Sequence, residues 1–121
     1  MATQEILREG WEAFCDSFSR LHAGWRVDVT VRNGDEQVLV RDMPLAGITA
    51  ELSYDGEDSV QVTAGNEPGE HVSHTVHRAA RIWLDQTKQG AHEAVRIESS
   101  TGAETIVRFY STVPPDMLNG V

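Results

Sequence analysis

From residue 25 onward, the apolar residues of this chain recur at every second position, the spacing of a β-strand with one buried face. In WRVDVTVRN, apolar side chains alternate with Arg, Asp and Thr, and the dipeptide Asn33-Gly34 follows. Asn-Gly is favoured in two-residue type I′ hairpins because both residues tolerate positive φ. We therefore expect the segment EQVLVRD to return as the second strand of a hairpin. The expected register is Val38 opposite Val29 and Val40 opposite Val27.

The same alternation predicts strands along most of the remaining chain. The apolar residues of segments 47–54 and 60–64 share one face across a turn at 55–57, and 65–70 has the composition of a loop. Four more strands are predicted in HVSHTVH, ARIWLDQT, EAVRIES and ETIVRFYS. We expect about six to eight antiparallel strands within residues 25–111, forming a strongly bent meander. Such a sheet either curls into a small barrel or forms two layers with a helix, and we expect the small barrel.

One helix is predicted before the strands, over residues 9–22. Its apolar side chains at Trp11, Phe14, Phe18 and Leu21 lie on one stripe of a 3.6-residue period. Gly24 follows at the position of a left-handed C-terminal cap. The stripe is expected to pack on the sheet, which makes residues 1–121 a single α+β domain. The tail at 112–121 contains paired prolines, so we expect it to run extended.

The charge balance disfavours several classes of partner. The chain has 19 acidic and 10 basic residues, a formal net charge of −9. Because nucleic acids and anionic membranes are bound mainly through Lys and Arg, neither is expected as a partner. The arginines on the polar strand faces are expected to pair with aspartates across the strands. The N-terminus lacks a signal-peptide pattern and no apolar run reaches about 20 residues, so we expect a cytoplasmic protein.

Three histidines at a three-residue spacing, His71, His74 and His77, are the most suggestive site candidates. Strand alternation places His71 and His77 on one face, roughly 20 Å apart, and His74 on the other. One zinc ion cannot join residues so placed, so no metal site is predicted. His74 faces the core between two valines, where it is either a satisfied core histidine or a general base. A base would need a partner, for which Tyr54, Asp85 and Glu98 are the candidates.

Other catalytic arrangements find little support in the sequence. Cys15 is the single cysteine, and His22 lies two helical turns away, roughly 10 Å along the axis, too far to activate it. We therefore expect a semi-buried structural thiol. The acidic residues of the turns do not follow the spacing of a calcium loop. No cofactor motif is found, and no cofactor is predicted.

Four segments together resemble a family of short bacterial proteins of unknown function. They are WEAFCDSFSRLHAGW (11–25), PLAGITA (44–50), HVSHTVH (71–77) and IESSTG (97–102). The resemblance covers nearly the whole chain, and it implies a stand-alone bacterial domain. It implies no activity, cofactor or catalytic residue.

The sequence therefore favours a non-enzymatic binding or accessory module that recognises a protein or a small ligand. Trp25, Trp83 and Tyr110 are the candidate interaction surface, because large aromatic side chains are enriched at interfaces. Two alternatives remain open. One is an enzyme or small-ligand pocket centred on His74, and the other is a structural homodimer formed through a sheet edge.

Overall fold

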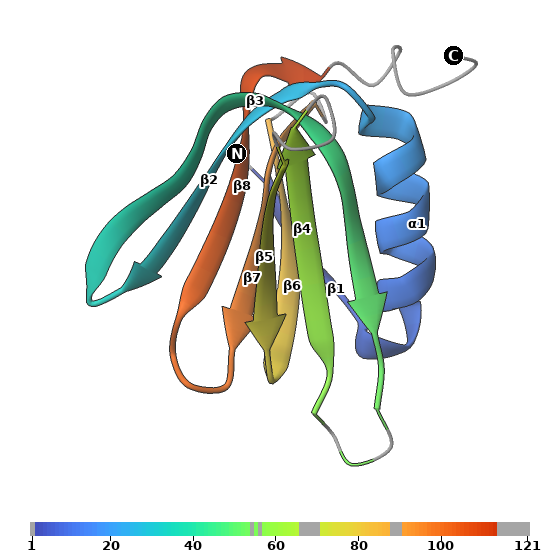
Figure 1. The fold of residues 1–121 in the computed structure, drawn as a ribbon. Helices are drawn as coiled ribbons and strands as arrows, with labels where there is room; N and C mark the ends of the chain where they lie inside the picture. The colour runs from blue at the N-terminus through green and yellow to red at the C-terminus, as the bar shows by residue number, and fades with distance from the viewer. Residues whose placement is uncertain (1, 54, 56, 66–70, 88–90, 114–121) are drawn as a thin grey trace.

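The computed structural model describes residues 2–53, 55, 57–65, 71–87 and 91–113, and Figure 1 shows their arrangement. One helix and eight strands follow one another along the chain. They are β1 (Ala2–Ile6), the 3₁₀ helix η1 (Arg8–Gly10), α1 (Trp11–His22), β2 (Arg26–Asn33), β3 (Asp35–Glu51), β4 (Ser59–Gly65), β5 (His71–His77), β6 (Ala79–Gln86), β7 (His92–Ser99) and β8 (Glu104–Val113).

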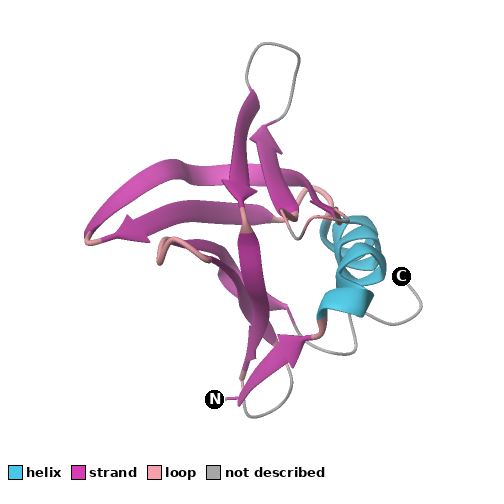
Figure 2. Cartoon of the chain, turned by 90° about the horizontal axis from the view of Figure 1, so that it is seen from below, coloured by secondary structure: helices cyan, strands magenta, loops and turns pink. Residues whose placement is uncertain are grey.

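All eight strands belong to one sheet with the order β1-β6-β7-β8-β2-β3-β4-β5, and every neighbouring pair is antiparallel. The predicted α+β fold, one helix on a strongly bent antiparallel sheet, is confirmed (Figure 2). The sheet is not a single meander, because the consecutive strands β5 and β6 are not neighbours in it. Within the described chain β1 and β5 are its two edges and do not pair, so the sheet stays open and no closed barrel forms.

The long strand β3 is shared between the two halves of the sheet. Its first part pairs with β2 and its last part pairs with β4. Within the part that pairs with β2, between Val40 and Met43, Asp42 has a positive φ of 56°, a conformation that Asp adopts more readily than most residues. Arg26 donates hydrogen bonds to the carboxylate and carbonyl of Asp42, and Asp28 accepts one from its backbone amide. These contacts hold the bend, and the predicted pairing of arginines with aspartates is confirmed here.

The predicted register of the first hairpin is wrong. In the structure Val40 lies opposite Val29, Val38 opposite Thr30 and Met43 opposite Val27. Gly34 has a φ of +81°, whereas Asn33 is not among the residues with positive φ, so the turn is not type I′. Irregularities on both sides of Val29 then shift the pairing further. A bulge places two residues of one strand opposite one residue of its partner, which the alternation of apolar residues alone does not indicate.

The second hairpin forms as predicted. Ile48 lies opposite Val62 and Ala50 opposite Val60, and all four side chains are buried. The inner faces of the other strands complete the core with valine, isoleucine and leucine side chains. The loop 66–70 and the tail beyond residue 113 lie outside the described residues, and β8 extends two residues into the predicted tail.

The helix ends at His22, as predicted, and Gly24 has the expected positive φ of +87° after it. Its buried side chains are Trp11, Cys15, Phe18 and His22. Leu21, expected on the buried stripe, is instead 40% exposed. The buried residues are separated by four, three and four positions, whereas the predicted stripe has separations of three, four and three. The observed separations are closer to the 3.6 residues of one helical turn.

An N-terminal strand and its connection to the helix were not predicted. β1 pairs with β6, and η1 then leads into the helix. Arg8 of η1 forms a bidentate ion pair with Asp58, whose other contact is the backbone amide of Ser53. Asp58 is 3% exposed, and the Arg8 hydrogen bond lowers the pKa of this carboxyl group. The pair therefore joins the start of the helix to the loop between β3 and β4.

Candidate functional site

Strand β5 carries its side chains in the predicted alternation. Val72, His74 and Val76 lie opposite Ala64, Val62 and Val60 on the inner face. His71 and His77 are exposed on the outer face. The predicted inward orientation of His74 is confirmed, and the three histidines do not converge.

His74 lines a pocket with a volume of about 310 Å³. The pocket lies between the edge strand β5, the inner side of β2 and the β7–β8 hairpin, and most of its accessible wall is apolar. Its lining residues are Val31, His74, Thr75, Val76, His77, Arg78, Ser99, Thr101, Ala103 and Thr105. Ligand pockets are commonly apolar with a few polar groups, and this one has hydroxyl groups, the imidazoles of His74 and His77 and the guanidinium of Arg78.

The imidazole of His74 has one polar contact from a neighbouring strand. Its Nε2 lies 3.3 Å from Oγ1 of Thr105, a residue only 2% exposed. Burial, and secondarily the proximity of His77, lowers the pKa of His74 below its ordinary value. The ring is therefore neutral at pH 7. In the described part of the chain, no group forms a hydrogen bond with its Nδ1.

Of the predicted partners, the two that the structure describes, Asp85 and Glu98, form no hydrogen bond with His74. Tyr54 lies outside the described residues. Asp85 accepts hydrogen bonds from Arg96 and Thr3, and Glu98 lines a different pocket. A histidine without a carboxylate to orient it lacks the arrangement expected of a general base in a triad.

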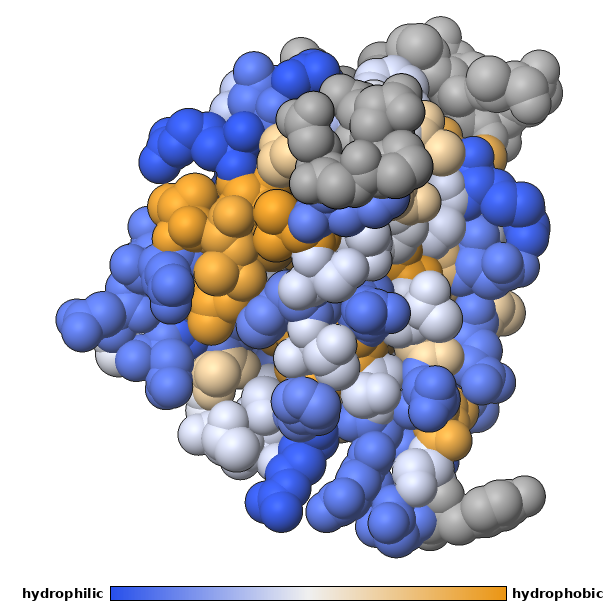
Figure 3. All heavy atoms as spheres, in the orientation of Figure 1, coloured by the Kyte–Doolittle hydropathy of each residue, from blue (hydrophilic) through white to orange (hydrophobic). Residues whose placement is uncertain are grey.

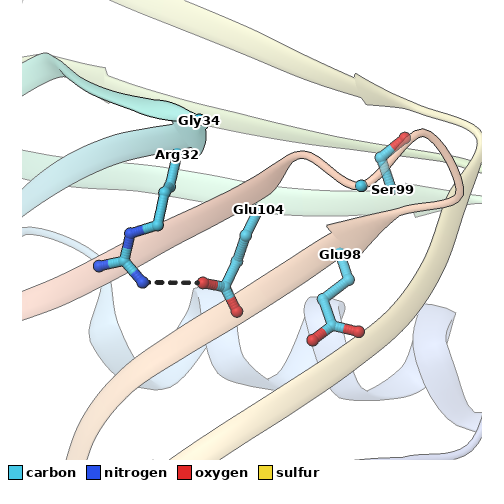
Figure 4. Close-up of a pocket in the computed structure, with 6 residues that line it drawn as sticks. Arg32, Gly34, Glu98, Ser99 and Glu104 are labelled. Atoms are coloured by element: carbon cyan, nitrogen blue, oxygen red, sulfur yellow. Dashed lines mark ion pairs between the residues drawn. The ribbon is translucent and has the colours of Figure 1, made fainter.

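A larger hollow of about 600 Å³ lies between the tips of the β2–β3 and β7–β8 hairpins (Figure 4). Its charged residues largely pair with one another. Glu104 forms ion pairs with Arg32 at 3.5 Å and with Arg96 at 3.2 Å. Glu98 points into the same hollow and forms no ion pair within the described ranges. The residues that line this hollow are polar or glycine, whereas typical ligand sites have mostly apolar walls. The smaller pocket at His74, whose wall is mostly apolar, is therefore the better candidate for a ligand site.

The comparisons with known proteins place the chain in a family. The model of a family of unknown function, DUF5335, matches residues 2–116. The chain belongs to the DUF5335 family. The resemblance to a bacterial family of unknown function is therefore confirmed. An uncharacterized protein of Aquifex aeolicus (strain VF5) is 27% identical over 116 residues, which cover 94% of this chain and 97% of the relative. No solved structure matches the chain. Since the DUF5335 description states no activity, function has to be argued from the residues.

The three aromatic residues of the predicted interaction surface do not come together in this DUF5335 protein. Trp25 is partly buried against the core. Trp83 lies on the opposite, outer face, where the guanidinium of Arg96 lies 5.7 Å from the ring centre. Tyr110 is 51% exposed on β8. Figure 3 shows instead an apolar patch over β2 and β3, the part of the chain that contains the exposed Val38.

A second histidine arrangement was missed at the sequence level. His22 at the end of α1 is fully buried, and its Nδ1 lies 2.8 Å from the carbonyl of Phe18. Because a carbonyl only accepts, Nδ1 carries the proton and Nε2 is an acceptor. Nδ1 of His92 lies 3.3 Å from that Nε2 and donates to it. Phe18 stacks on both imidazoles, with its ring centroid 4.0 Å from that of His22 and 6.0 Å from that of His92. The Phe109 ring is tilted against His22 at a centroid distance of 5.0 Å.

Both rings of this pair are held neutral. Burial lowers the pKa of His22, and burial together with His22 lowers the pKa of His92 to about 4. The helical stripe that runs through Cys15 and Phe18 to His22 would have identified the buried member. No local signal indicates His92, which is 70 residues away in the chain.

Cys15 is buried more completely than the predicted semi-buried thiol, at 1% exposure. Burial raises the pKa of its thiol to about 12, so the thiolate does not form at neutral pH. Across the described residues no three His, Cys, Asp or Glu side chains gather as metal ligands do. In the same part of the chain, no helix combines the length and apolar character needed to cross a membrane.

Proposed function

We propose that this DUF5335 protein is a non-enzymatic binding module, and that the pocket at His74 takes a small uncharged ligand with an apolar body and one hydrogen-bonding group. The observation that supports the proposal is the combination of an apolar wall with a neutral imidazole whose Nδ1 has no partner in the described chain. A volume of about 310 Å³ is at the lower end of ligand pockets, which suits a small molecule.

Charge supports an uncharged ligand. The one cation at the pocket, Arg78, lies 3.6 Å from Glu57, and the imidazole of His74 is neutral at pH 7. The net charge of −9 adds long-range repulsion toward anions. For the same reason the proposal includes neither nucleic acid nor an anionic membrane as a partner. A cytoplasmic location is also part of the proposal.

The alternative is an enzyme centred on His74. It is favoured by the contact between His74 and the hydroxyl of Thr105, which resembles a base beside a nucleophile. The hydroxyl is almost completely buried, however, and the lining residues include no carboxylate. Binding therefore has more support than catalysis.

Binding is tested by titrating the protein with benzyl alcohol, benzoate and benzylammonium while recording ¹H–¹³C NMR spectra. The three probes share one ring and differ in charge. We expect benzyl alcohol to shift the His74 ring signals and the Ala103 methyl signal, with much smaller shifts from the two ions. Ala103→Phe, which fills the pocket, should abolish the response. His71→Ala, on the exposed face of the same strand, should leave it unchanged. The absence of shifts at His74, or their persistence in Ala103→Phe, would contradict the proposal.

The same protein tests the catalytic alternative through hydrolysis of p-nitrophenyl acetate. If binding alone is correct, wild type and Thr105→Val should hydrolyse the ester at equal rates. A loss of at least about tenfold in Thr105→Val with retained folding would favour the enzyme, because removing a nucleophile costs orders of magnitude in rate.

A further inference from the structure

The outer edge of β5 is unpaired along most of its length. β5 ends the sheet and pairs only with β4. The carbonyl of His77 points away from β4, since it accepts a hydrogen bond from the hydroxyl of Ser99. Backbone groups alternate in direction along a strand, so the N–H and C=O groups of Ser73 and Thr75 point the same way. Figure 2 shows the β4–β5 hairpin projecting from the remaining strands.

This edge lacks the features that usually protect an exposed strand. Proteins commonly place a charged side chain, a proline or a bulge on such an edge to prevent pairing with another chain. The other edge, β1, carries Glu5. β5 contains no proline and no residue with a formal charge, in a chain where charged residues make up 24%. Its pairing with β4 runs without a register shift.

The sequence of β5 is nearly symmetric about its centre. HVSHTVH reads the same in both directions apart from the exchange of serine and threonine. In an antiparallel pair of two such strands centred on His74, each residue meets its own kind or a close relative. The pairs are His71 with His77, Val72 with Val76, Ser73 with Thr75, and His74 with itself. Two-fold dimers require this kind of self-complementary surface.

We propose that two copies of this chain pair through β5, antiparallel and about a two-fold axis at His74. Ser73 of each copy then exchanges backbone hydrogen bonds with Thr75 of the other, using the groups that point outward. The two His74 residues form the central pair without backbone hydrogen bonds, where Cα atoms of antiparallel strands lie about 4.5 Å apart. The Ser99 hydroxyl already occupies the carbonyl of His77, so the main contacts lie between residues 73 and 75. This inference does not rest on ligand binding at the pocket.

Sedimentation velocity over about 10 μM to about 1 mM chain, the range of a weak interface, tests the proposal. Wild type is expected to shift from monomer to dimer within this range. Thr75→Pro removes an outward N–H while the bonds to β4 remain, which edge strands tolerate. It should raise the dimer dissociation constant at least about tenfold. Thr75→Val, which keeps the N–H, should stay dimeric. Thermal unfolding by circular dichroism checks that each variant folds.

A charge exchange tests the register itself. In the double variant Ser73→Lys with Thr75→Lys, like charges oppose each other across the axis, so it should be monomeric. In Ser73→Lys with Thr75→Glu, opposite charges meet only in the register centred on His74, so the dimer should return. A wild-type protein that is monomeric at about 1 mM, or a Thr75→Pro variant as dimeric as wild type, would overturn the inference. Equal behaviour of the two double variants would overturn the register.

Discussion

Two parts of this protein bury an imidazole, and they differ in what surrounds it. At the C-terminal end of α1, the ring of His22 is fully buried, stacked on Phe18 and hydrogen-bonded at both nitrogens. At the open side of the sheet, His74 is bonded at one nitrogen and lies beside a pocket. Burial lowers the pKa of both residues. A lowered pKa therefore does not separate a structural histidine from a candidate binding residue, whereas free space and an unused hydrogen-bonding group do.

The difference follows from the elements that carry the two residues. His22 lies at the end of the helix's buried stripe, and its side chain is 0% exposed. His74 lies on the last strand of an open sheet, where no further strand covers its side. The pocket at His74 therefore lies beside an edge strand of the sheet.

The largest expected effect is the loss of stability in His22→Ala. The change leaves a cavity in the core and deprives His92 of its acceptor, so unfolding should become easier by about 3 kcal/mol. Urea unfolding followed by circular dichroism measures it. Leu21→Ala, at a neighbouring exposed position, should cost less than about 0.5 kcal/mol. Equal effects of the two variants would mean that the histidine pair is not a structural unit.

A smaller effect is expected in His74→Ala. The ring borders free space, so its loss mainly leaves the buried hydroxyl of Thr105 without a partner, at a cost of about 1 kcal/mol. His71→Ala on the exposed face should be neutral within about 0.5 kcal/mol. If His74→Ala instead costs as much as His22→Ala, His74 is a packed core residue and the comparison fails. Chemical denaturation of all three variants at one pH decides between these outcomes.

Acid should weaken the helix-end pair. The pKa of His92 is about 4 in the folded protein, against an ordinary 6.5. As the pH falls from 6.5 toward 4, the unfolded chain binds a proton on this side chain and the folded chain does not, so stability is lost in this window. Because the ring is partly solvated, we expect a contribution of about 1 kcal/mol. Between pH 6.5 and pH 4, the unfolding free energy of the wild type should decrease by about 1 kcal/mol more than the unfolding free energy of His92→Asn. Parallel pH profiles of the two proteins would refute it.

Local patterns predicted the elements but not all of their partners. The alternation in β4 and β5 correctly placed Val60, Val62 and His74 on the inner face, because side-chain direction on a strand depends only on position. The β2–β3 register failed because the turn at Gly34 is not the expected type I′ turn and because irregularities on both sides of Val29 shift the pairing. β1 was missed since its alternation is short and polar, and only pairing with β6 makes it a strand.

The sequence by itself determined the helix, the number of strands within about two, the inward direction of His74 and the failure of a three-histidine metal site. Each depends on geometry within one element, which a few residues specify. The tertiary structure alone decided that the sheet stays open, that Thr105 meets His74, and that His22 meets His92. Those contacts join residues 31 and 70 positions apart. Such pairs depend on strand order and sheet curvature, which no local pattern records.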